Sequence, residues 1–136
     1  MSGIKEFVSL NNPSLSKKTV TFFTTCLRIG QEAGDLIPDI PIFVDPSFGN
    51  PKPKNEMSFL EKNHLVTTYM KEISDMAMDI KPITVSFFKG VLDYSTIGFF
   101  WTLFFKFTGR LDGVGPGDYR NWEAIRSWTE QTYSSL

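Results

Sequence analysis

The sequence predicts an α/β protein built on parallel strands, because two β-rich segments flank one amphipathic helix. Residues 18–26 are β-branched and aromatic, and residues 82–93 read Pro-Ile-Thr-Val-Ser-Phe-Phe-Lys-Gly-Val-Leu-Asp. Between them, apolar side chains recur at helical spacing over residues 66–80. A strand–helix–strand order gives two parallel strands joined by a crossover. The length of 136 residues fits one domain.

Composition and charge exclude several classes of function. A net charge of −1 gives no basic surface for non-specific binding of nucleic acid. A single cysteine permits no internal disulfide and fits a reducing compartment, so we expect a cytoplasmic protein. The first residues lack the charged and apolar regions of a secretory signal. A single histidine and scattered acidic residues predict neither a metal centre nor an acid–base catalytic pair.

The first elements are a short helix and a strand. Ile4, Phe7 and Val8 share one helical face, and Pro13 is expected to end that helix. It resembles the last part of a helix whose beginning is missing. The strand within residues 18–26 carries no charge after Lys18, which predicts burial on both faces, as in a parallel sheet.

A long proline-rich insertion loop is predicted over residues 27–57. Loops of this length in a compact domain are usually functional lids or small insertions. Residues 40–44 read Ile-Pro-Ile-Phe-Val and could add a short strand. Pro41 would confine that strand to the edge of a sheet, because proline cannot donate a backbone hydrogen bond.

Two helices have clear start signals. Ser58 and Glu61 form a predicted capping box, which opens one helix that continues to about Asp79. His64 lies away from its apolar face, so we expect a solvated side chain. Asn121 is the predicted N-cap of the last helix. Its expected inner face consists of Trp122, Ile125, Trp128 and Thr129.

An aromatic insert with a glycine-rich connection occupies residues 94–117. Residues 99–107, from Phe99 to Phe107, predict a very apolar helix whose polar stripe holds Thr102 and Lys106. One interpretation is a peripheral contact with a membrane. Packing on the sheet or against a partner is favoured, because a lysine- and arginine-rich polar face is missing. The glycines of residues 109–117 predict a flexible connection rather than an anion cradle.

The predicted elements leave the sheet incomplete. Two parallel strands do not form a doubly wound sheet, whose faces and edges must be covered. Either residues 40–44 and another chain complete the sheet, or the chain is half of a domain. We therefore expect a homo-oligomer or a partner chain that supplies an N-terminal half.

Five segments give a family resemblance. The first two are residues 5–8 (Lys-Glu-Phe-Val) and the first strand, residues 18–26. The others are residues 85–93 (Val-Ser-Phe-Phe-Lys-Gly-Val-Leu-Asp), the aromatic segment that ends at residues 104–109 (Phe-Phe-Lys-Phe-Thr-Gly), and residues 117–128 (Gly-Asp-Tyr-Arg-Asn-Trp-Glu-Ala-Ile-Arg-Ser-Trp). From Gly3 onward the chain resembles the C-terminal half of flavodoxin-like domains of the menaquinone-dependent protoporphyrinogen oxidase type. Asn121 stands where such relatives commonly have aspartate.

The resemblance implies a three-layer sandwich around a five-stranded parallel sheet. FMN would lie at the carboxyl ends of the strands, where open α/β sheets bind ligands. The first strand and its phosphate-binding loop have no counterpart in this sequence. By position alone, the loop beside the flavin ring would consist of Thr24, Thr25, Cys26, Leu27 and Arg28. This implies an FMN-dependent electron-transfer or oxidoreductase system, in which the chain would need a partner to hold the phosphate.

Two alternatives stand beside that implication. The chain could be a non-catalytic interaction module that derives from a flavodoxin domain. Cys26 could be a redox thiol, but a lowered thiol pKa would be required and Arg28 is the only nearby cation in the sequence. An inert, buried Cys26 is the preferred interpretation, and no catalytic residue is predicted.

Overall fold

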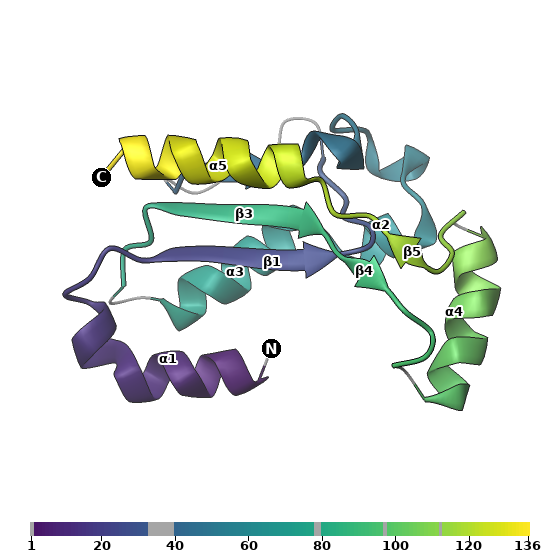
Figure 1. Ribbon diagram of the computed structural model, residues 1–136, viewed down its shortest axis with the longest axis horizontal. Coiled ribbons are helices and arrows are strands. Elements are labelled where there is room, and N and C mark those ends of the chain that lie inside the picture. The colour runs from purple at the N-terminus through teal and green to yellow at the C-terminus, as the bar shows by residue number, and fades with distance from the viewer. Residues whose placement is uncertain (1, 33–39, 78–79, 97, 112) are drawn as a thin grey trace.

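A parallel three-stranded sheet forms the centre of the molecule. The computed structural model describes residues 2–32, 40–77, 80–96, 98–111 and 113–136. The sheet consists of β1 (Thr21–Cys26), β2 (Ile42–Val44) and β3 (Thr84–Lys89), in the order β1-β3-β2 (Figure 1). β3 pairs in parallel with both neighbours. The predicted α/β class is confirmed, and residues 40–44 supply an edge strand as predicted.

Helices and a small β-ribbon surround this sheet. The helices are α1 (Ser2–Leu15), α2 (Phe59–Asn63), α3 (Val66–Met76), α4 (Phe99–Leu111) and α5 (Trp122–Ser134). The ribbon pairs β4 (Val91–Leu92) with β5 (Gly117–Asp118) in antiparallel fashion. Within the predicted insertion loop of residues 27–57, β2 is followed by two 3₁₀ turns, Pro46–Phe48 and Lys54–Glu56. Of this loop, residues 33–39 lie outside the described part.

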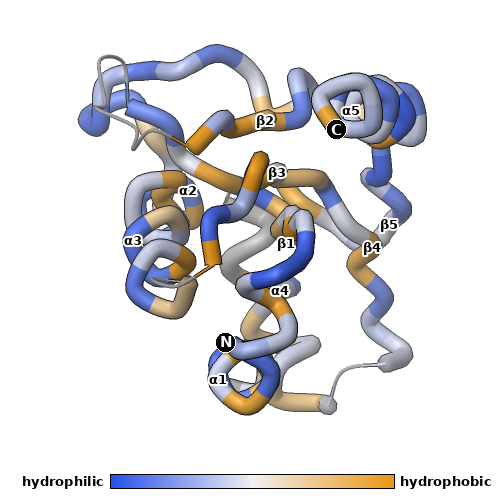
Figure 2. The backbone as a smooth tube through the Cα atoms, turned by 90° about the vertical axis from the view of Figure 1, so that its left-hand side faces the viewer, coloured by the Kyte–Doolittle hydropathy of each residue, from blue (hydrophilic) through white to orange (hydrophobic). Residues whose placement is uncertain are grey.

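The central strand β3 divides the core between two helix layers. Its alternating side chains pack on α3 through Phe87, which contacts Tyr69, and on α5 through Phe88, which contacts Trp128 edge to face. Figures 1 and 2 show α3 and α5 on opposite sides of the sheet, with α1 on the side of α3. Residues buried on that side come from several elements: Val8, Phe22, Val66, Met70, Ile73, Ala77, Ile80, Val85 and Phe87.

The expectation that the first strand is buried on both faces is wrong. Phe22 is buried, but Phe23 on the opposite face is 65 % exposed and Thr25 is also exposed. The reason is position in the sheet: β1 is an end strand, and α5 packs over β3. One face and one edge of β1 are therefore open among the described residues.

Pro13 does not end the first helix. α1 continues through Pro13 to Leu15, and the Ser16 N–H donates to the Asn12 carbonyl beyond it at 2.9 Å. Proline removes one backbone donor. Pro13 is exposed and lies in the last turn, so water can reach the carbonyl that loses its partner.

The predicted single helix of residues 58–79 is two helices. The capping box at Ser58 is confirmed, since its hydroxyl accepts from the Glu61 N–H at 3.3 Å and the Glu61 carboxylate accepts from the Ser58 N–H at 2.7 Å. α2 then ends, and an extended link to α3 forms a parallel bridge with Gly30. Within this link the half-buried His64 places Nδ1 2.9 Å from the Tyr69 hydroxyl, so the solvated histidine was a wrong prediction.

The cap of α5 is confirmed, whereas its predicted inner face is partly wrong. The Asn121 side chain accepts from the Ala124 N–H at 3.1 Å. Ala124 is buried and Trp128 donates to the Thr84 hydroxyl at 3.4 Å. In contrast, Trp122 is mostly exposed, with the Arg120 guanidinium over its ring at 4.9 Å. The predicted inner residue Thr129 is also exposed.

The aromatic insert forms a helix that does not bury its apolar side chains. α4 stands at the end of the molecule to which β1 and β3 point (Figure 1). The favoured expectation was packing on the sheet or against a partner. Its first half is wrong, because six large apolar side chains of α4 are between 47 % and 84 % exposed: Phe99, Phe100, Trp101, Leu103, Phe104 and Phe107. Packing against a partner stays a prediction. Among the described residues, no helix is long and apolar enough to cross a membrane.

Candidate functional site at the carboxyl end of the sheet

Ionisable side chains from three segments lie at the carboxyl end of the parallel strands. Cys26 ends β1 and lies opposite Lys89, which ends β3. Asp45 follows β2, and its N–H donates to the Phe87 carbonyl at 3.0 Å. Because the three strands run in the same direction, these ends lie at one edge of the sheet, where α/β proteins bind ligands. This edge is the candidate site.

Asp45 is a fully buried carboxylate that joins two segments of the chain. One of its oxygens accepts from the Ser47 N–H at 2.9 Å and from the Asn121 side-chain amide at 3.0 Å. The other oxygen has no hydrogen-bond partner among the described residues. Asp45 thereby connects the turn after β2 to the start of α5, and it fixes the Asn121 cap.

Lys89 places a cation on the same edge. Its ammonium donates to the Ser47 carbonyl at 2.6 Å and lies 5.4 Å from the centre of the Phe48 ring. Burial lowers the Lys89 pKa, and the nearby Arg28 lowers it further, whereas Asp45 and Cys26 oppose this shift. Arg28 and Lys89 thus lie close enough to repel each other, which gives this edge a local positive charge.

Cys26 is held as a neutral thiol. Burial raises its pKa from 9.0 to about 12, and the positive charge of Lys89 opposes this effect only in part. Its sulfur lies 4.0 Å from the Phe88 carbonyl oxygen. The thiolate is the reactive form of cysteine, so this environment favours the interpretation of an inert Cys26.

We expect Cys26 to react slowly with iodoacetamide at pH 8. A pKa of about 12 leaves roughly a thousandfold less thiolate than an ordinary cysteine has at that pH. Alkylation of the native chain, followed by mass spectrometry, measures the rate, and the urea-unfolded chain is the control. If the native and unfolded chains react at similar rates, Cys26 is not shielded.

The structure separates the five residues predicted to lie beside a flavin ring. The side chains of Thr24 and Cys26 point to the α3 side of the sheet, whereas Thr25 is exposed on the other side. Leu27 and Arg28 are half-buried in the segment after β1. A single ligand would therefore touch the segment through its backbone and through only some of these side chains.

Sequence reasoning missed the residues that build this edge. Asp45, Lys89 and the amide of Asn121 were not predicted as site residues. A signal existed for Asp45, which directly follows a short apolar strand, and for Lys89, which is the first charge after a buried strand. The connection between Asp45 and Asn121 spans 76 residues and had no sequence signal.

The described residues do not fit the phosphate of an FMN. Its phosphate requires a loop of free backbone N–H groups that leads from a strand into a helix. After β1 the chain runs to the Gly30 bridge, after β2 it enters a 3₁₀ turn whose Ser47 N–H binds Asp45, and after β3 it enters β4. The described part of the chain therefore offers no phosphate cradle.

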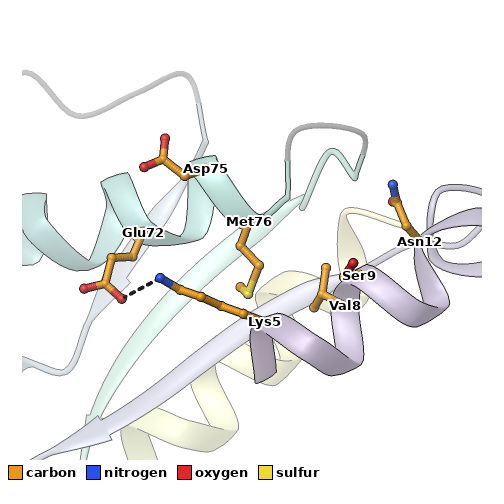
Figure 3. A pocket seen from close by; sticks show the side chains of 7 residues that line it. All are labelled: Lys5, Val8, Ser9, Asn12, Glu72, Asp75 and Met76. Atoms are coloured by element: carbon orange, nitrogen blue, oxygen red, sulfur yellow. Dashed lines mark ion pairs between the residues drawn. The ribbon is translucent and has the colours of Figure 1, made fainter. Parts of the chain in front are cut away.

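A separate cavity of about 340 Å³ lies between α1 and α3 (Figure 3). Its lining includes Lys5 and Glu72, whose charged groups are 3.7 Å apart, together with Val8 and Met76. None of the residues predicted to lie beside a flavin lines it. The cavity is open, and its salt bridge joins exposed side chains, which contribute little to stability.

Comparisons with protein-family models, with curated proteins and with solved structures found no match to this chain. Among the described residues, no group of histidine, cysteine and carboxylate side chains is arranged to hold a metal ion.

Proposed function

We propose that this chain is the C-terminal half of a flavodoxin-like domain that works in an FMN-dependent electron-transfer or oxidoreductase system together with a second chain. The observation that carries the proposal is the open side of β1. Its outer edge is unpaired among the described residues, and Phe23 on its α5 side is 65 % exposed. An open strand edge with an exposed apolar side chain beside it is a template for pairing with another strand.

The arrangement of the other elements agrees with this half-domain. α3 connects the sheet strands as a crossover helix, and α5 covers the opposite face. A doubly wound sheet extended beyond β1 would have β1 as an inner strand, which accounts for its β-branched and aromatic sequence. The added strands would also cover Phe23. A homo-oligomer or an N-terminal-half partner chain could supply them.

In this proposal each of the two chains contacts a different part of FMN. FMN supplies the electron-transfer chemistry when it is bound. This chain contributes the segment from Cys26 to Arg28 beside the ring, with the positive charge of Arg28 and Lys89 behind it. The neutral Cys26 takes no part in bond making. The partner would hold the phosphate.

We expect the purified chain to bind riboflavin and FMN with equal, weak affinity. The physical reason is that the two ligands differ only in the phosphate, for which the described residues have no cradle. A cradle of two or more N–H groups would favour FMN by at least about 100-fold, since each charge-assisted hydrogen bond contributes roughly 1.5–3 kcal/mol. Titration with each flavin, followed by flavin fluorescence, measures both affinities.

Two variants test where the flavins bind on this chain. Arg28→Gln should weaken both flavins alike, whereas Arg126→Gln, on the exposed side of α5, should change neither. A strong preference for FMN would show that this chain has its own phosphate site and is more than a half-domain. If neither flavin binds at any protein concentration, including concentrations at which the chain self-associates, the flavin role of this chain is disproved.

The second candidate is a protein-interaction module without a flavin. One observation favours it: at the candidate site, Asp45, Lys89 and Asn121 are engaged with the chain itself. This module would use the β1 edge in the same way but would remain colourless. A Phe23→Lys variant should lose association in sedimentation experiments under either function, so the flavin titration alone distinguishes the two.

A further inference from the structure

The structure exposes apolar side chains of α4 over more than half of the helix circumference. At 100° per residue, the exposed side chains of Phe99, Leu103, Phe107, Phe100, Phe104 and Trp101 cover an arc of about 200°. Phe100 is 84 % exposed and Phe107 is 73 % exposed. A continuous apolar surface of this kind marks a site that another surface covers.

One polar residue of α4, Thr102, is turned toward the rest of the protein, whereas Lys106 is exposed. The half-buried Thr102 donates from its hydroxyl to the Tyr94 carbonyl at 3.5 Å, just before the helix. The antiparallel pair of β4 and β5 closes the base of the insert. The Tyr119 hydroxyl donates to the Gly115 carbonyl at 2.8 Å and fixes the returning segment. α4 is therefore attached at both ends, with its aromatic arc facing outward.

We propose that α4 docks the protein on an anionic lipid bilayer and lies within one leaflet. The charge of the helix agrees with a negative surface: α4 contains no acidic residue, and its only charged residues are Lys106 and Arg110. The polar face of α4 is not rich in lysine and arginine, but its two basic residues stand beside phenylalanine and tryptophan, a combination that occurs in helices at the headgroup boundary. Attraction to anionic lipid adds to the burial of apolar area.

The length of α4 agrees with this position. Its 13 residues give a helix of about 20 Å, which is shorter than the roughly 30 Å hydrocarbon core. Such a helix can lie in the interface but cannot span the bilayer. The width of the exposed arc also favours lipid over a protein groove, because a fluid bilayer can surround most of a helix, whereas a groove receives one stripe of side chains.

Binding to vesicles tests the proposal with the full chain. We expect co-sedimentation with vesicles of phosphatidylcholine and phosphatidylglycerol, and weaker binding to phosphatidylcholine alone. The double variant Phe100→Ser/Phe104→Ser should lower the partition coefficient at least about tenfold. Phe59→Ser, which changes a side chain that is 61 % exposed on α2, is the matched control and should bind as the wild type does.

Two further readouts separate apolar insertion from charge attraction. Lys106→Glu should reduce binding to the anionic vesicles and leave binding to phosphatidylcholine unchanged. Brominated lipids should quench part of the tryptophan fluorescence, and Trp101→Phe should remove that quenching while Trp122→Phe does not. Far-ultraviolet circular dichroism checks that each variant is folded.

Several results would overturn the proposal. One is that the chain binds neither the vesicles that contain phosphatidylglycerol nor those of phosphatidylcholine alone. Another is equal loss of binding in Phe59→Ser and Phe100→Ser/Phe104→Ser, which would show that any exposed phenylalanine suffices. A third is self-association of the chain that excludes vesicles and disappears in the double variant, since a second copy would then cover α4. These outcomes do not depend on flavin binding, so they leave the proposed function to its own test.

Discussion

Replacing Gly30 with alanine is expected to lower the free energy of unfolding by about 3 kcal/mol. A Cβ at this position would lie 2.5 Å from the Glu61 carbonyl oxygen and 2.9 Å from side-chain atoms of Leu65 and Met57. The nearest of these atoms belongs to the backbone and cannot rotate away. Gly30 also donates to the His64 carbonyl and accepts from the Val66 N–H, both at 2.9 Å, and any shift would weaken these bonds.

Urea denaturation, followed by circular dichroism, measures this effect. Gly3→Ala is the matched control, because an added Cβ there meets no atom within 4 Å. Gly3 lies in α1, so this variant should be neutral or up to about 1 kcal/mol more stable, since alanine favours helices over glycine. Equal stability of Gly30→Ala and the wild type would contradict the close approach of the two segments at Gly30.

The second large effect is expected at the buried carboxylate. Asp45→Ala should lower the free energy of unfolding by about 3 kcal/mol, because it leaves the Ser47 N–H and the Asn121 amide without their acceptor. Ser47 lies in the same turn as Asp45, whereas the segment that contains Asn121 meets this turn only in the folded chain. Thermal and urea denaturation of the variant measure the loss.

Asp45→Asn distinguishes hydrogen bonding from charge. Its amide oxygen can still accept from both donors, so we expect a loss of less than about 1 kcal/mol. If this variant is as unstable as Asp45→Ala, the negative charge beside Lys89 is the stabilising feature instead. A double-mutant cycle with Asn121→Ala should give a coupling energy of about 1 kcal/mol or more between the two side chains.

Local signals in the sequence were sufficient to predict most helices and strands. The capping box at Ser58, the cap at Asn121 and the edge strand near Pro41 depend on neighbouring residues, and the structure confirms all three. The β-branched and aromatic residues within 82–93 were enough to predict the strand that the structure has at Thr84–Lys89. These features follow from backbone hydrogen bonding and side-chain periodicity, which act over a few residues.

Other predictions failed where contacts with segments distant in the sequence decide the local structure. The long helix is broken at His64 and Leu65 because Gly30 takes up the backbone groups of the link between α2 and α3. Phe23 is exposed because of the place of β1 in the sheet order. In neither case do the neighbouring residues contain the deciding information.

The sequence by itself determined the α/β class, the parallel strands and the presence of an unusually apolar helix within residues 94–117. Only the tertiary structure decided that this helix faces outward and that Asp45, Lys89 and Asn121 meet at one edge of the sheet. One physical reason explains why the sequence determined the first group of features and not the second. Hydrophobic periodicity sets local structure, whereas burial and long-range hydrogen bonds depend on which segments the fold brings together.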